Sequence, residues 1–73
     1  MPTAAELKAR IESAIAGAHA EVESPDDVHF TARVTSSSFA GLSRVEQHRM
    51  VYDVFGGELG ESIHALSLKT ESP

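Results

Sequence analysis

The chain has 73 residues, the size of one small domain that buries only about 60% of the surface of its unfolded state. It contains no cysteine, which excludes disulfides and a cysteine-ligated zinc site. Eleven acidic and six basic residues give a net charge of -5, the wrong sign for a protein that mainly neutralises phosphates. The first residues include neither a basic stretch nor a long apolar run, so we expect a soluble cytoplasmic protein without a secretory signal or a membrane span.

A capping box predicts the first helix, because Thr3 is followed three residues later by Glu6. The apolar residues that come next have the spacing of one buried helical stripe, and Gly17 is expected to end the helix. The stripe consists of Leu7, Ile11, Ala14, Ile15 and Ala18.

A hairpin is predicted to follow the helix. Apolar and polar residues alternate over 18–23 and again over 28–35, which is the pattern of two half-buried strands. The segment 24–27, Ser-Pro-Asp-Asp, is typical of a turn between them. His19 and His29 belong to the polar face of this hairpin, and the serine run 36–38 is interpreted as a strand end and turn.

A second capping box, Ser43 with Glu46, predicts a helix that Gly56 and Gly57 end. Residues 58–62 are expected to form a single helical turn, and the aliphatic content of 63–70 predicts a third strand. The inner face of the second helix is expected to consist of Val45, His48, Val51, Tyr52 and Phe55.

The predicted order of elements is αββααβ. Three strands make a thin sheet, but two amphipathic helices packed on one of its faces would bury the apolar side of every element. We therefore expect an α+β two-layer sandwich, a three-stranded mixed sheet with its helices on one face, as a single domain over residues 1–73.

The histidines are the candidate functional groups. His64 stands at the start of an apolar strand in a protein without cysteine, so it is either a packed structural residue or a metal ligand. His48 lies on the apolar stripe of the second helix and is expected to be a core histidine hydrogen-bonded to the backbone. His19 is expected at the surface. Nucleophile elbows, paired catalytic carboxylates and phosphate loops are missing from the sequence, which predicts that the protein is not an enzyme.

Three blocks in order resemble the BolA family: Ser-Ser-Phe-Ala-Gly at 37–41, His-Arg-Met-Val-Tyr at 48–52, and Ile-His-Ala-Leu-Ser-Leu-Lys-Thr at 63–70. The His29-Phe30 pair is also similar to the family's second strand. The resemblance covers about the last two thirds of the chain. It implies an αββααβ fold similar to a class II KH domain.

The resemblance also implies a noncatalytic partner of a monothiol glutaredoxin that shares a 2Fe-2S cluster and acts in iron-sulfur cluster assembly, trafficking or iron sensing. The family's ligand histidine corresponds to His64. Many members offer a second ligand from the loop between the first two strands, where this chain has only residues 24–27, with Asp26 near the position of a thiol. His29 is therefore either an auxiliary ligand or a polar-face strand histidine.

A cysteine-free chain can contribute only imidazoles to such a cluster, so we expect that it binds none alone and completes a site held by the partner's thiolates. When free, the protein is expected to be a monomer or a weak homodimer through exposed strand edges.

Nucleic-acid binding is the alternative function. Residues 57–60, Gly-Glu-Leu-Gly, stand where a KH domain carries its backbone-clamping loop, but Glu58 has the wrong charge for a phosphate contact. The basic residues nearby, Arg44, Arg49 and Lys69, are the candidate contacts and are too few for a convincing basic stripe. The sequence therefore favours a protein partner over a nucleic acid.

Overall fold

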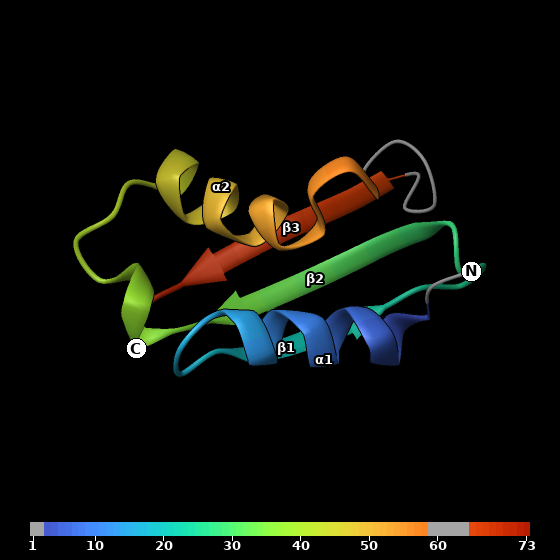
Figure 1. Ribbon diagram of the computed structural model, residues 1–73, viewed down its shortest axis with the longest axis horizontal. Helices are drawn as coiled ribbons and strands as arrows, with labels where there is room; N and C mark the ends of the chain where they lie inside the picture. The colour runs from blue at the N-terminus through green and yellow to red at the C-terminus, as the bar shows by residue number, and fades with distance from the viewer. Residues whose placement is uncertain (1–2, 59–64) are drawn as a thin grey trace.

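The protein is a two-layer α+β sandwich, described by a computed structural model for residues 3–58 and 65–73. Both helices cover the same face of a three-stranded mixed sheet (Figure 1), which confirms the predicted fold class. The elements are α1 (Ala4–Ala14), β1 (His19–Glu23), β2 (His29–Thr35), the short 3-10 helix η1 (Ser37–Phe39), α2 (Arg44–Phe55), the short 3-10 helix η2 (Gly56–Glu58) and β3 (Ala65–Glu71).

The start of α1 follows the prediction and its end does not. The Thr3 hydroxyl accepts a hydrogen bond from the Glu6 backbone N–H at 3.2 Å. The helix ends at Ala14 with Ile15 as its C-cap, so the expected stop at Gly17 is wrong. Gly17 instead lies in the turn toward β1 with φ at +70°, where a Cβ atom would also stand 3.0 Å from the Ser37 hydroxyl. Both observations explain why a glycine occupies this turn.

The sheet has the order β1-β2-β3, with β1 antiparallel and β3 parallel to β2. The predicted hairpin is confirmed, although β2 begins at His29 and Val28 belongs to the loop. Parallel pairing of β2 with β3 requires a crossover, which α2 provides. The described part of β3 begins at Ala65, so the predicted strand start at Ile63 and most of the predicted helical turn lie outside the described residues.

The core lies between the helices and the sheet. The inward residues of the strands alternate with exposed ones, as in the β2 pattern from His29 to Thr35. Partly buried apolar residues, including Met50, Val54, Leu66 and Leu68, pack against this core. The buried apolar residues are Leu7, Ile11, Ile15, Ala18, Ala20, Phe30, Ala32, Val34, Phe39, Val51 and Phe55.

The inner face of α2 differs from the prediction. The capping box of Ser43 and Glu46 is present and Gly56 caps the C-terminus, as expected. Val45, however, is 65% exposed, and His48 and Tyr52 are only partly buried. Val51 and Phe55 are buried as predicted, and the helix is rotated so that Val54, which the prediction left out, packs against the core beside them.

Gln47 explains this rotation. Its amide nitrogen donates to the backbone oxygens of Phe39 at 3.2 Å and Leu42 at 3.1 Å, and its amide oxygen accepts from the Thr70 hydroxyl at 2.6 Å. One polar side chain thus connects α2 to the preceding loop and to β3. Because these three hydrogen bonds hold Gln47 toward the loop and β3, Val45, two residues earlier on the helix, faces outward.

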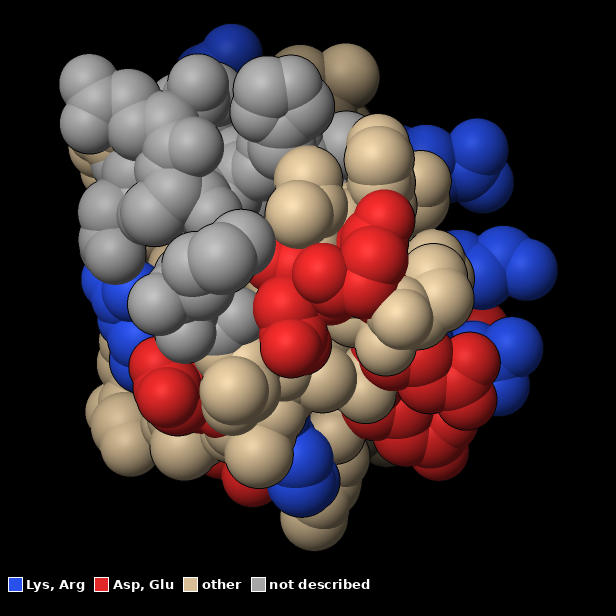
Figure 2. Space-filling view, turned by 90° about the vertical axis from the view of Figure 1, so that its right-hand side faces the viewer, with Lys and Arg blue, Asp and Glu red and all other residues tan. Residues whose placement is uncertain are grey.

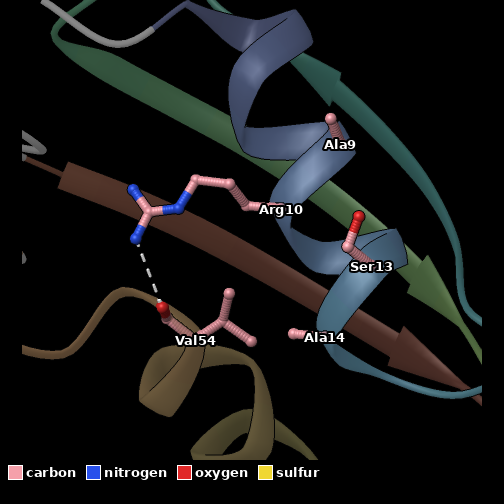
Figure 3. A pocket seen from close by; sticks show the side chains of 5 residues that line it. All are labelled: Ala9, Arg10, Ser13, Ala14 and Val54. Carbon is pink, nitrogen blue, oxygen red and sulfur yellow. Dashed lines mark hydrogen bonds between the residues drawn. The ribbon is translucent and has the colours of Figure 1, made fainter.

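Arg10 connects the two helices (Figure 3). Its guanidinium donates to the Val54 carbonyl at 3.3 Å and lies 4.9 Å from the centre of the Phe55 ring. Val54 is in the last turn of α2, where carbonyls have no partner within the helix and where a positive charge is favourable. The last turn of α2 has no basic residue of its own, so α1 supplies the cation. The hollow beside it, about 390 Å³, is lined mostly by small side chains of α1.

The free edge of β1 is covered by two side chains of α1. The Glu12 carboxylate accepts from the Ala20 N–H at 3.0 Å, and the Lys8 ammonium donates to the Ala20 carbonyl at 3.0 Å. Lys8 and Glu12 also form an ion pair at 2.8 Å. An edge strand with occupied backbone groups is a poor template for pairing with another chain.

Ser36 is a fully buried polar residue that joins three segments. Its hydroxyl donates to the Ala16 carbonyl at 2.7 Å and accepts from the Ser38 N–H at 3.0 Å. Its own N–H donates to the Glu71 carbonyl at 3.1 Å, which extends the pairing of β2 with β3. The hydroxyl therefore links the turn after α1 to the end of the parallel strand pair.

Replacing Ser36 with alanine should lower the free energy of unfolding by about 1–3 kcal/mol, because the Ser38 N–H would lose its partner in a buried site. Ser37→Ala is the matched control, since Ser37 is exposed, and should change stability by less than about 0.5 kcal/mol. Urea unfolding followed by circular dichroism measures both. Equal stability of the two variants would contradict the structural role of the Ser36 hydroxyl.

The Glu12 contact should make stability depend on pH. Hydrogen bonds from Lys8 first and from the Ala20 N–H second lower the pKa of Glu12 from its usual 4.5. A lowered pKa means that the stabilisation is fully present above about pH 4.5 and is lost as the pH falls below that value. Glu12→Gln should therefore lose less free energy of unfolding than the wild type when the pH is lowered from about 6 to about 3. Urea unfolding at both pH values measures this difference.

Glu21→Gln is the control for this comparison. Glu21 is an exposed residue of β1, next to Ala20, and no hydrogen bond to its side chain is present in the described part of the chain. It should keep the acid sensitivity of the wild type. If both variants lost the same amount of acid sensitivity, the general charge of the protein, and not the edge contact, would be responsible.

Candidate functional site

The loop between β1 and β2 is ordered by its own side chains. The Asp26 carboxylate accepts hydrogen bonds from the backbone N–H groups of Val28 at 3.0 Å and His29 at 2.9 Å. The Ser24 hydroxyl accepts from the Asp27 N–H at 2.9 Å and donates to the His29 carbonyl at 2.6 Å. Such bonds from Asp and Ser side chains fix a short turn. His29, the first residue of β2, therefore starts from a defined backbone position.

The imidazole of His29 is also positioned. Its Nδ1 lies 2.8 Å from Oδ2 of Asp26, while the other oxygen of that carboxylate holds the loop backbone. A carboxylate oxygen only accepts, so Nδ1 carries the proton of this hydrogen bond, and in the neutral ring Nε2 is the nitrogen without a proton. Hydrogen bonds from the His29 N–H, then its ring, then the Val28 N–H hold the pKa of the Asp26 carboxyl well below its usual range. Asp26 thus remains ionised as the acceptor for His29.

His64, the main predicted ligand, lies outside the described residues. Its sequence neighbour Ala65 is described and pairs with His29 in the parallel register of β2 and β3. The start of β3 therefore lies beside the start of β2, next to the loop that contains Asp26.

This end of the sheet is acidic. Figure 2 views the molecule from this end and shows acidic side chains gathered beside the residues that are not described. Glu23, Asp26 and Asp27, which end β1 and form the loop, are all exposed. The acidic character disfavours a phosphate backbone as the ligand of this surface.

The candidate nucleic-acid residues lie elsewhere and are divided. Arg44 begins α2, and Lys69 lies late in β3, where it pairs with Arg33. Arg44 and Lys69 line one hollow together with Glu71, whereas Arg49 lines a different one. The three cations therefore do not line one common hollow. Of the predicted backbone-clamping loop 57–60, residues 59 and 60 lie outside the described residues.

The other two histidines have different outcomes. His19 is exposed, as predicted, and pairs with Thr35 at the end of the sheet opposite His29. The expectation for His48 is wrong: its Nε2 is buried without a hydrogen-bond partner in the part of the chain that the structure describes. The His48 ring packs edge-on against Tyr52, with ring centres 6.2 Å apart. Because the Val45 side of α2 is turned outward, His48 does not make the expected hydrogen bond to a backbone carbonyl.

The sequence interpretation placed Asp26 near a ligand position but missed its contact with His29. The signal was present, because a Ser-x-Asp turn three residues before a histidine allows the carboxylate to reach both the backbone and the ring. Within residues 3–58 and 65–73, no group of three or more His, Cys, Asp or Glu side chains is arranged to hold a metal ion. The helices in the same part of the chain are too short or too polar to cross a membrane.

A protein-family model described as BolA-like protein matches residues 3–73. The chain belongs to the BolA family. This confirms the resemblance carried by the three sequence blocks. The name of the family model describes no enzymatic activity, and the absence of catalysis stays a prediction.

Curated and solved relatives of this BolA family member agree with the assignment. BolA-like protein 1 of Mus musculus is 32% identical over 82 aligned residues, which cover 99% of this chain and 59% of the mouse protein. The chain thus spans about three fifths of the length of that relative. The structure of a bolA protein homologue from Coxiella burnetii is 36% identical, with a TM-score of 0.86 and coverage of 100% of this chain and 94% of that one.

The same fold occurs as part of a larger protein. The BolA domain of SufE1 from Arabidopsis thaliana has a TM-score of 0.83 and 29% identity, and covers 96% of this chain and 91% of that domain. SufE-like protein 1 of Arabidopsis thaliana is 40% identical over 47 residues, which are 64% of this chain and 13% of that protein. A BolA domain can therefore be joined to other domains.

The Asp26 contact predicts the tautomer of His29. At a pH where the ring is neutral, the proton should reside on Nδ1, because Asp26 accepts it there. Long-range proton–nitrogen NMR spectra of the ring distinguish the two nitrogens. Asp26→Ala should shift the His29 ring toward the Nε2-protonated form and leave the spectrum of His19 unchanged, and an Nδ1 without a proton in the wild type would contradict the contact.

Proposed function

We propose that this BolA family member is a noncatalytic partner of a monothiol glutaredoxin and supplies imidazole ligands, His64 and His29, to a shared 2Fe-2S cluster. The role would lie in iron-sulfur cluster assembly, trafficking or iron sensing. The observation that carries the proposal is the hydrogen bond between Asp26 and the Nδ1 of His29. Cytoplasmic location and a monomeric or weakly dimeric free form belong to the same proposal.

The donor set supports a shared cluster and not one held by this chain alone. The chain has no cysteine, and the part that the structure describes has no three-residue metal-binding group. Iron in such clusters takes thiolates, with imidazoles at one of the two irons in some proteins. The thiolates would come from the partner, and this chain would complete the coordination with nitrogen.

The geometry at His29 supports a ligand role. Histidines that bind metals commonly donate their second ring nitrogen to a carboxylate, which fixes the ring and the tautomer. Asp26 accepts from Nδ1, so Nε2 would be the coordinating nitrogen, and the His29 side chain is 63% exposed. When bound, the cluster would supply iron that accepts an electron or is transferred. Asp26 would hold the imidazole of His29 in the orientation of a ligand.

The sheet register supports the pairing of the two histidines. His29 lies opposite Ala65, which follows His64 in the sequence. The short loop 24–28 carries no cysteine, so His29 is the residue of the β1–β2 segment with the chemistry of a second ligand. The acidic residues of this end, Asp26 and Asp27, would orient a partner that presents basic side chains.

A titration of cluster-loaded monothiol glutaredoxin with this protein tests the proposal. The visible circular-dichroism spectrum should change as the imidazole enters the coordination of the cluster, to an end point that His64→Ala abolishes. His29→Ala should weaken complex formation by about tenfold or more, because a carboxylate-oriented ligand is lost. His19→Ala is the matched control: His19 is an exposed histidine at the opposite end of the same sheet and should leave the titration unchanged.

An unchanged spectrum with the wild type would overturn the proposal. If His64→Ala acts and His29→Ala does not, His29 is a structural partner of Asp26 and the second ligand comes from elsewhere. The nucleic-acid alternative is tested in parallel by measuring binding to DNA and RNA over a range of salt concentrations. Specific binding whose affinity falls steeply with salt would favour that alternative.

A further inference from the structure

The two edges of the sheet are treated differently by the fold. At the edge of β1, the Ala20 N–H and carbonyl are occupied by Glu12 and Lys8 of α1. At the edge of β3, no strand pairs on the side away from β2 within the described residues. The fold thus covers the edge of β1 at Ala20 and gives the edge of β3 no equivalent contact within the described residues.

The exposed backbone groups of β3 can be assigned. The Glu71 carbonyl accepts from the Ser36 N–H, so the backbone of Glu71 faces β2. Because consecutive residues of a strand direct their backbone groups to opposite sides, Leu68 and Thr70 direct theirs to the free edge. Among the described residues, no hydrogen bond to the backbone groups of Leu68 or Thr70 is present on that side.

A hollow of about 350 Å³ borders this edge. It is lined by inward-facing residues of β3, Leu68 and Thr70, and by outward-facing ones, Lys69 and Glu71. A hollow that reaches both faces of one strand has to include the edge of that strand. Residues of α2 form its other wall, Arg44 and His48.

The charge of the hollow differs from that of the whole protein. The chain carries a net charge of -5, yet the hollow contains two cations, Arg44 and Lys69, against the single carboxylate of Glu71. The other wall adds His48, whose buried Nε2 has no hydrogen-bond partner in the described part of the chain. The unused backbone groups of Leu68 and Thr70 and an excess of positive charge therefore lie in one place.

The geometry points to a docking site for an extended acidic segment of another protein, which adds as a fourth strand along β3. A peptide backbone supplies the alternating donors and acceptors that Leu68 and Thr70 present, as in strand addition generally. A carboxylate of the segment would be attracted by Arg44 and Lys69. A nucleic acid matches less well. A phosphate backbone lacks the alternating donors and acceptors that pair with a strand edge, and the Glu71 carboxylate repels its charge.

This site is separate from the proposed cluster ligands. Lys69 pairs with Arg33 and Glu71 with Thr35, near the end of β2, whereas His29 is its first residue. The docking site therefore neither requires nor excludes a cluster. An experiment on the cluster-free protein tests it independently of the glutaredoxin proposal.

The probe is a fluorescein-labelled synthetic peptide of alternating valine and glutamate, with the same seven-residue length as β3. Fluorescence anisotropy measures its binding, and a peptide with lysine in place of glutamate is the charge control. We expect the glutamate peptide to bind at least about tenfold more tightly than the lysine peptide. In amide hydrogen exchange, the N–H groups of Leu68 and Thr70 should become protected when the glutamate peptide is bound.

Charge reversal locates the contact. Arg44→Glu and Lys69→Glu should each weaken binding by about tenfold. Lys8→Glu makes the same change in net charge on α1, beside the opposite edge of the sheet and outside the hollow, and should change affinity by less than about twofold. Circular dichroism checks that all three variants fold.

Each contrary outcome overturns the inference. If the glutamate peptide does not bind, or if the lysine peptide binds equally well, the hollow is not a docking site for an acidic segment. Protection of Leu68 and Thr70 that rises with protein concentration without peptide would assign the edge to a second copy of this chain. Tighter binding of a single-stranded oligonucleotide of equal charge, lost in Arg44→Glu, would assign the hollow to nucleic acid.

Discussion

The parallel pairing of β2 with β3 is the constraint on which the rest of the structure depends. Parallel strands cannot be joined by a tight turn, so the chain has to cross over the sheet, and α2 is that crossover. The crossover places α2 on the same face as α1. Phe55 thereby takes a core position beneath the Arg10 guanidinium. The same pairing sets the start of β3 next to His29 and the loop that contains Asp26. Packing of the core and assembly of the candidate site are thus consequences of one register.

Polar side chains keep this register in place. Gln47 ties α2 to β3 through Thr70, and Ser36 ties the end of β2 to Glu71 and to the turn after α1. Both act where a slip of one residue would exchange the buried and exposed faces of β3. A small domain has few apolar contacts to resist such a slip, so buried hydrogen bonds that fit only one arrangement carry much of the specificity.

Most of the fold could be predicted because its signals are local. The alternation around Phe30 and the capping box of Ser43 and Glu46 depend only on neighbouring residues, and both are present in the structure. The inner face of α2 could not be predicted in the same way, because its sequence offers two overlapping apolar stripes. The stripe that contains Val45 is apolar in the sequence. The helix nevertheless turns the side with Gln47 inward, where the Gln47 amide donates to the carbonyls of Phe39 and Leu42.

The candidate site shows the same division. The position of His29 at the start of a strand followed from alternation, and its neighbourhood to the segment after His64 was implied only by the family resemblance. The contact between Asp26 and the His29 ring depends on how a five-residue loop folds around one carboxylate, which composition does not reveal. The rotation of α2 also affects the two other predicted residues that differ, because it leaves Val45 exposed and His48 only partly buried, without the expected hydrogen bond to the backbone.

The two surfaces proposed for this protein are compatible because they lie at opposite ends of one sheet. The hollow begins at Leu68, three residues after Ala65, and at about 3.3 Å per residue this separates the two sites by roughly 10 Å along β3. A strand added near Thr70 would leave Asp26 and His29 untouched, and a partner bound at His29 would leave the hollow beside Arg44 open. β2 and β3 both run from one site to the other, and any coupling between the two ligands would have the same magnitude in both directions. If both proposals hold, the acidic end and the cationic hollow would receive two different partners, each on its own part of the sheet.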